Sequence, residues 1–192
     1  EPTRLPEAVR AMSKAGLLRD PEMAGVYVGF IAGVLGSNAD RAEKLIAGMF
    51  PIAPEEQAVI VRGIAYSGLP GWKELLAKFA ERMPARRVMI DRHLFGNAKG
   101  LMELPLESGP TSLDILWGYY FATGSEQPVE RIISAMAWSD EKHDVEKLTA
   151  AGMAKWTLAT NATRSAELLD VCRRQLARQP KETRAALRQV VD

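Results

Sequence analysis

Apolar residues recur along this chain at the spacing of one helix face, in blocks that follow glycines. After each of Gly36, Gly68 and Gly124, apolar positions follow the order i, i+3, i+4, i+7, i+8, which is one face of an α-helix. The three stripes are Ala42, Leu45, Ile46, Met49 and Phe50; Trp72, Leu75, Leu76, Phe79 and Ala80; and Val129, Ile132, Ile133, Met136 and Ala137. The pattern predicts, about three times, a helix that ends at a glycine, a turn and a second helix.

Turn and capping residues divide the rest of the chain into further helices, about ten in all. Asp20-Pro21-Glu22 predicts a helix start, with an Asp cap, a proline at the first helical position and an acid near the positive end of the helix. The other clearest predicted helices cover 6–15, 39–50, 72–83 and 145–160. Residues 96–110 are rich in glycine and proline, so we expect a loop with at most one short helical turn there.

The glycine spacings indicate a repeated hairpin. Gly36 and Gly68 are 32 residues apart, close to the roughly 34-residue period of tetratricopeptide repeats. The longer gap to Gly124 fits one period plus an irregular insertion near residues 84–110. A hairpin alone buries one face only, so neighbouring hairpins must cover the other. We therefore predict a single all-α domain over 1–192, with antiparallel helical hairpins stacked as a short right-handed α-solenoid.

One segment also resembles a known class of repeats. The run Gly118 to Gly124, followed by Pro128 and Ala135, resembles tetratricopeptide and Sel1-like helical repeats, over roughly residues 21–178. Proteins of this architecture typically bind peptides or partner proteins in a concave groove. The resemblance therefore implies a protein-interaction role and no catalysis.

Composition and charge narrow the function classes. Apolar residues make up 47% of the 192 residues, enough for a core, and the formal net charge of +1 gives no overall attraction to nucleic acid. No run reaches the roughly 20 apolar residues that a membrane span needs. The single Cys172 excludes an internal disulfide, which fits the cytoplasm and also a bacterial periplasm. Since Glu1 is not preceded by methionine, a removed leader and a trimmed start both stay open, as do exported and cytoplasmic locations.

The tyrosines are the candidate partner-binding residues. All four of them, Tyr27, Tyr66, Tyr119 and Tyr120, fall on the predicted first helices of hairpins. Tyrosine offers a large contact area with a polar hydroxyl at a low entropic cost. We expect them to line a groove. The aromatic run from Trp117 to Phe121 has a second interpretation, because a central helix packed on all sides would have the same composition.

Other reactive residue types predict no catalytic, metal or cofactor site. His93 and His143 each lie near acids, but nothing in the sequence brings them together, and a metal needs three or four converging ligands. The paired acids Glu55 and Glu56 sit where a helix begins, a position that the helix dipole explains. Cys172 lies on an apolar stripe, as core cysteines do.

Two alternatives to a non-catalytic interaction scaffold stay open. An enzyme or small-molecule carrier could have its pocket under the 84–110 insertion, formed by His93 and Arg86 or Arg87, since long irregular loops in compact domains are often functional. A structural subunit of an assembly is the third possibility. The sequence leaves the partner and the oligomeric state open.

Overall fold

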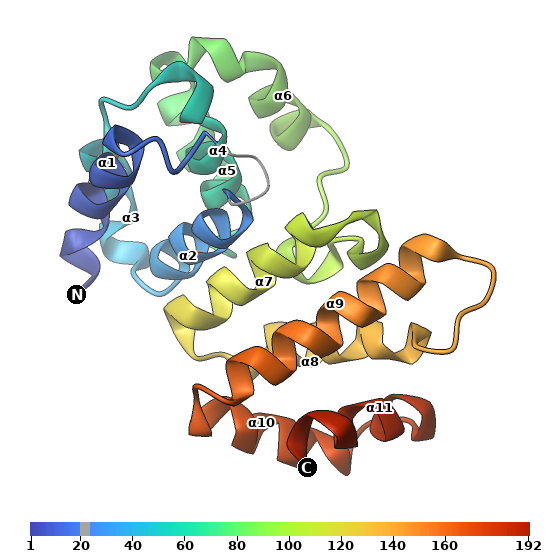
Figure 1. The fold of residues 1–192 in the computed structure, drawn as a ribbon. Helices are drawn as coiled ribbons and strands as arrows, with labels where there is room; N and C mark the ends of the chain where they lie inside the picture. Colours follow the sequence, from blue (N-terminus) through green and yellow to red (C-terminus); the bar gives the residue numbers. More distant parts are fainter. Residues whose placement is uncertain (20–23) are drawn as a thin grey trace.

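The structure, a computed structural model, describes residues 1–19 and 24–192, and all regular elements in these ranges are helical (Figure 1). The α-helices are α1 Leu5–Lys14, α2 Ala24–Gly36, α3 Ala42–Met49, α4 Ala58–Ala65, α5 Trp72–Phe79, α6 Arg87–Phe95, α7 Pro110–Thr123, α8 Glu126–Ser134, α9 Val145–Ala162, α10 Ala166–Leu176 and α11 Lys181–Val191. The all-α prediction is confirmed. The helix start predicted at 20–22 lies outside the described residues.

Local sequence signals set several helix ends. The Asp144 carboxylate accepts a hydrogen bond from the Lys147 amide at 3.1 Å and begins α9, and the Ser165 hydroxyl does the same for the Leu168 amide at α10. Gly124 ends α7 in the left-handed conformation, with φ of 66°. The chain therefore ends α7 and begins α9 and α10 by ordinary capping chemistry.

Gly36, the last residue of α2, is needed for a different reason. It is not among the glycines with positive φ, so the conformational explanation that holds for Gly124 does not apply to it. A Cβ on Gly36 would instead overlap the carbonyl oxygen of Ser67, just beyond α4. Gly36 is thus needed for the close approach of two segments.

The centre of the fold is a contact between α2 and α7, which lie side by side (Figure 1). A Cβ on Gly29 would overlap the Ile115 carbonyl oxygen and lie 2.8 Å from the Tyr119 amide nitrogen. A Cβ on Gly118 would lie 2.8 Å from the Phe30 amide nitrogen. The glycines on this face of α2 are spaced four residues apart: Gly25, Gly29 and Gly33. Without their side chains, the two backbones come into direct contact.

Helix α4 packs on a second face of α2. A Cβ on Gly63 of α4 would lie 2.6 Å from a methyl group of Ile31, while Gly36 lies against Ser67. Later residues of α2 face later residues of α4. The same holds for α2 and α7, where Gly25 faces Asp114 and Gly33 faces Ala122. Helices α2, α4 and α7 therefore run parallel.

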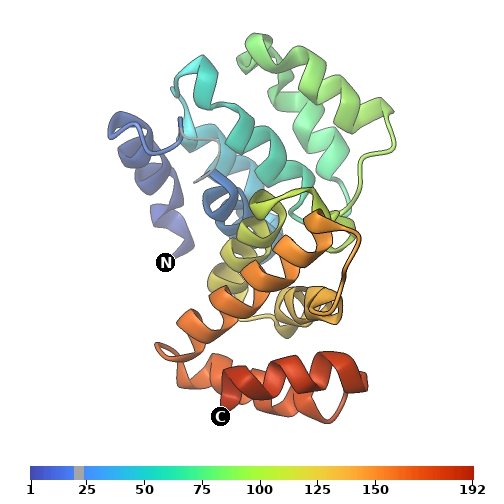
Figure 2. The same cartoon turned by 45° about the vertical axis from the view of Figure 1, so that its right-hand side comes forward.

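The order of packing along the chain is not that of a simple stack. Helices α1–α6 form one half and α7–α11 the other, and α7 packs on α2 rather than continuing from α6 (Figures 1 and 2). The 84–110 segment contains α6 and three short 3-10 turns, Pro84–Arg86, Leu101–Glu103 and Leu106–Ser108. The last two turns lie within 96–110, one more than the sequence predicts there. It is anchored to the core, because Leu101, Leu104 and Leu106 are buried. None of the helices in the described ranges has the length and apolar character of a membrane span.

One carboxylate lies wholly inside this fold. Glu56, just before α4, has no exposed side-chain surface, and its oxygens accept hydrogen bonds from the Ser13 hydroxyl and from Arg19 Nε, the latter at 3.0 Å. The sequence places Glu55 and Glu56 together as acids at a helix start. The structure gives Glu56 another role, since it ties the end of α1 to the start of α4.

Cys172 should not react with thiol reagents while the protein is folded. It is buried on α10, and burial raises the pKa of its thiol to about 11. At pH 8 the reactive thiolate is then only about one part in a thousand. We expect slow labelling by a disulfide-exchange reagent at pH 8 and rapid labelling in denaturant. Fast labelling of the native protein would show that α10 opens readily.

Candidate functional site

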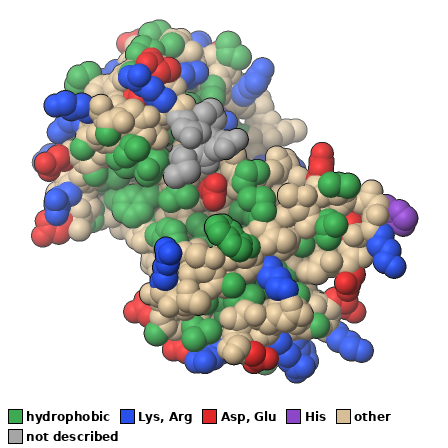
Figure 3. Space-filling model, in the orientation of Figure 1, with side chains coloured by type: hydrophobic (Ala, Val, Ile, Leu, Met, Phe, Trp, Pro, Cys, Tyr) green, Lys and Arg blue, Asp and Glu red, His purple; other side chains and the backbone are tan. Residues whose placement is uncertain are grey.

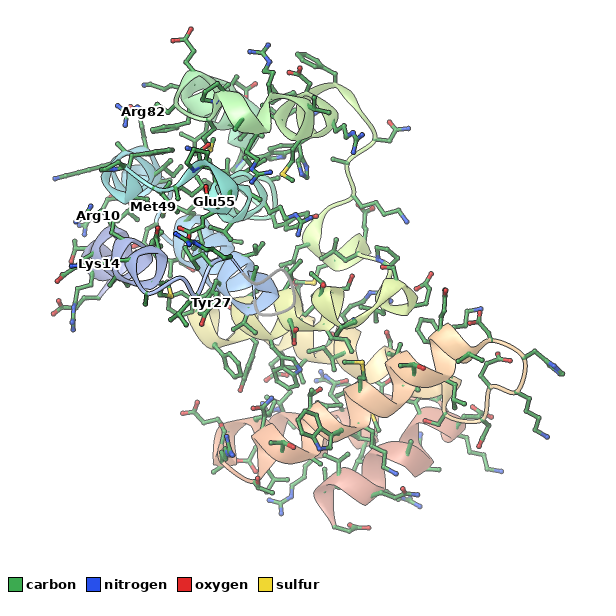
Figure 4. All side chains as sticks on the ribbon, turned by 45° about the horizontal axis from the view of Figure 1, so that its top comes forward. Arg10, Lys14, Tyr27, Met49, Glu55 and Arg82 are labelled. Atoms are coloured by element: carbon green, nitrogen blue, oxygen red, sulfur yellow. The ribbon has the colours of Figure 1, made fainter. Side chains whose placement is uncertain are left out.

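The four tyrosines lie in different environments. Tyr27 is half-buried on α2 and is labelled in Figure 4. Tyr66 follows α4, and its ring lies edge-on to the His93 ring, with the two ring centroids 6.0 Å apart. Tyr119 is half-buried on α7, and a Cβ on Gly36 of α2 would lie 3.6 Å from its hydroxyl. Tyr120 is only 8% exposed and packs against Trp117.

The tyrosines therefore do not line one surface. Burial raises the pKa of Tyr120, and Glu167 of α10 raises it further, while a hydrogen bond from Ser165 lowers it. This places the Tyr120 hydroxyl toward α10, away from the α2 side, where Tyr119 lies. Tyr66 lies just beyond the end of α4, beside His93 of α6. The described surface has two large hollows, and of the four tyrosines only Tyr66 lines one of them.

The first hollow, called here the apolar groove, lies between α1, the second half of α2 and the end of α7. Its volume is about 520 Å³. Phe30 and Phe121 line it and are 37% and 51% exposed, although both are large hydrophobic residues. The other apolar lining residues are Pro2, Leu5, Ala8, Ala11, Val34 and Ala122. Figure 3 shows hydrophobic side chains gathered over the N-terminal helices on the face it presents.

The second hollow, called here the basic pocket, lies between α4, α6 and residues 96–99. Its volume is about 670 Å³. Four cationic side chains line it, with a histidine and a tyrosine: Arg62, Arg86, Arg92, Lys99, His93 and Tyr66. Its described lining contains no acidic residue. The alternative that the sequence leaves open, an enzyme or carrier pocket under the 84–110 insertion, involves His93 and Arg86 or Arg87. His93 and Arg86 line this pocket.

Hydrogen bonds orient some of the basic side chains. Arg86 donates from Nε to the Pro54 carbonyl at 3.1 Å and from Nη2 to the Glu55 carbonyl at 2.6 Å. Arg87 pairs with Asp91 at 3.0 Å instead and does not line the pocket. Within the described residues, Arg62, Arg92 and Lys99 form no ion pair.

His93 lies among aromatic rings and cationic side chains. Its ring lies edge-on to the rings of Tyr66 and Trp72, and the centroids of the His93 and Trp72 rings are 6.5 Å apart. Burial lowers the pKa of His93, and the nearby positive charge of Arg62 lowers it further. Its buried Nδ1 atom has no hydrogen-bond partner in the described structure. His93 is thus kept neutral by surroundings that already carry positive charge.

One histidine considered in the sequence lies away from both hollows, and two residues that line the hollows were not anticipated. His143 is exposed in the turn before α9, apart from His93, and the described residues include no group of three or more His, Cys, Asp or Glu side chains able to share a metal. Sequence reasoning did not single out Arg62 or Phe30. Arg62 lies on α4 and Tyr66 directly follows the helix, four residues later, a spacing that places both on one side of it.

Known proteins add no assignment to these sites. Comparisons with protein-family models, with curated proteins and with solved structures each gave no significant match to this chain.

Proposed function

We propose that this protein is a non-catalytic interaction module whose apolar groove binds an amphipathic helix of a partner protein. The observation that carries the proposal is the exposure of Phe30 of α2 and Phe121 of α7 in one groove. Large apolar side chains that share an exposed hollow are typical of protein-interaction sites. The proposal keeps the scaffold role expected from the hairpin pattern and moves it from the tyrosines to the two phenylalanines.

The shape of the groove favours a helix as the occupant. Its walls are helices with apolar positions three or four residues apart, Ala8 and Ala11 on α1 and Phe30 and Val34 on α2. An amphipathic helix presents its own anchors at the same spacing and inserts them into grooves of this kind. The two alanines leave room between the larger residues. The rim carries both signs of charge, from Glu1, Arg4 and Glu7, so the apolar contact provides most of the binding energy.

The hairpin architecture is part of the proposal. Helices α2, α4 and α7 run parallel, as first helices do in tetratricopeptide-like solenoids, and such arrays bind partners along their helices. We propose that this chain is a variant of that architecture in which α4 and α7 both pack on α2.

Replacing Phe30 and Phe121 together by alanine should weaken partner binding by about 30-fold or more. Removing two central aromatic anchors typically costs 2 kcal/mol or more, which is about a 30-fold loss of affinity. The measurement is the affinity for helical peptides selected against the full chain from a random amphipathic library. Because both rings are already exposed in part, the variant should keep its helical circular dichroism.

Phe95→Ala is the matched control, since Phe95 is 80% exposed on α6 and does not line the groove. Peptides that bind all three proteins equally would refute the groove as the site. A wild-type dimer that dissociates in the double variant, with no peptide selected, would identify the occupant as a second copy of the chain and refute the partner helix.

A further inference from the structure

The basic pocket is a second site, independent of the apolar groove. Its four cationic side chains come from α4, α6 and the segments on both sides of α6, and no acidic side chain of the described lining balances them. The whole chain carries a formal net charge of only +1. Positive charge is therefore concentrated here, and a walled hollow strengthens the local potential.

The contents of the pocket suit one kind of ligand. Arginine presents planar pairs of N–H donors that match the oxygens of phosphate and carboxylate groups. Arg86 is held in place by two backbone carbonyls, which lowers the entropic cost of using it. Apolar side chains, among them Val88 and Met89, line the same hollow and leave a surface for a carbon skeleton. The volume of about 670 Å³ lies in the range of small-molecule sites.

We propose that the basic pocket binds a small organic phosphate, with its phosphate oxygens on Arg62 and Arg92 and its organic part against Met89 and Tyr66. A phosphate monoester carries about 1.5 to 2 negative charges at pH 7, so it balances more of the four cations than a single carboxylate does. The Tyr66 hydroxyl is a further donor, since burial raises its pKa and keeps the phenol protonated.

His93 offers a direct readout of binding. The chain has two histidines, so the NMR signals of His93 and His143 can be assigned by one substitution. The charged and titratable groups around His93 come from α4, α5, α6 and the segments flanking α6: Arg62, Tyr66, Lys73, Arg86, Arg92 and Lys99. A bound phosphate offsets part of this positive charge and raises the pKa of His93. His143 is exposed elsewhere and serves as an internal reference.

The test is a titration of the full chain with phenyl phosphate at constant ionic strength, followed at both histidines. We expect a saturable change at His93 in the millimolar range or below, a higher His93 pKa in the complex, and no change at His143. Arg62→Gln and Arg92→Gln should each weaken binding about tenfold, because each removes a charged donor. Arg164→Gln, an exposed arginine in the turn before α10, is the matched control and should bind as the wild type does.

Three results would overturn the proposal. No saturable change at His93, or an equal change at both histidines, would show that the pocket holds no specific anion. Equal binding by the wild type and both arginine variants would place the phosphate elsewhere. Benzoate that binds as tightly as phenyl phosphate would show that the site takes organic anions without selecting phosphate, which refutes the assigned class. None of these results bears on the apolar groove, so the two proposals fail separately.

Discussion

Alanine in place of Gly29 should destabilise the protein by about 3 kcal/mol, the upper end of the usual cost of overpacking. The added Cβ would overlap the Ile115 carbonyl oxygen and lie 2.8 Å from the Tyr119 amide nitrogen. Both of these atoms belong to backbone, which cannot rotate away as a flexible side chain does. Relief therefore requires α2 and α7 to separate, and that separation weakens the contact that joins the two halves of the fold.

Urea unfolding followed by circular dichroism measures this loss. Gly152→Ala is the matched control, because Gly152 is exposed within α9 and has no atom within 4 Å of its added Cβ. There the same substitution should stabilise the helix by about 0.5 to 1 kcal/mol. Equal effects at the two sites would mean that α2 and α7 leave room for a Cβ at Gly29.

Arg19→Ala should cost about 2 kcal/mol, although Arg19 is a surface residue. Removing one member of a buried ion pair typically costs about 3 to 5 kcal/mol, because the remaining charge is left without compensation inside the protein. Glu56 is completely buried, while the Arg19 side chain is 61% exposed, so water replaces part of what Arg19 provides. The expected cost is accordingly below that range and above that of an exposed pair.

A double-mutant cycle separates this effect from simple loss of surface contacts. In a Glu56→Gln background no buried charge remains, so Arg19→Ala should cost less than about 0.5 kcal/mol there. The exposed pair Arg87–Asp91, also at 3.0 Å, provides a matched comparison, and Arg87→Ala should cost about 0.3 to 0.5 kcal/mol. An Arg19→Ala effect of the same size in both backgrounds would disprove the coupling.

The sequence predicts the helices well because their signals are local. Gly124 and Asp144 act at the positions where they stand, and amphipathic stripes identify buried faces such as Ile132 and Ile133 without knowledge of the partner. The α2–α7 contact is different in kind. Glycines four residues apart in α2 indicate a face that something approaches closely, but a single sequence does not say which of the other helices does so.

In the candidate sites too, the sequence predicts what is local along the chain and misses what tertiary packing brings together. Placing the pocket beside the 84–110 segment was possible because His93 and Arg86 belong to that segment. Arg62 comes from α4 and joins them only through tertiary packing. The expectation that Tyr119 and Tyr120 line one groove rests on their falling on the same predicted first helix of a hairpin. Consecutive helical residues point about 100° apart, so one of them lies near α2 and the other toward α10.

The pairing of α2 with α7 has a consequence for synthesis on the ribosome. Residues 37–109 separate the two helices, so α2 emerges well before the helix that covers its glycine face. At ordinary translation rates this interval lasts about 4 to 15 s. During that time a strongly apolar helix lacks one of its two main partners, and of these two only α4 can shield it. The order in which the chain emerges therefore makes α2 the segment that a nascent-chain chaperone would be expected to hold.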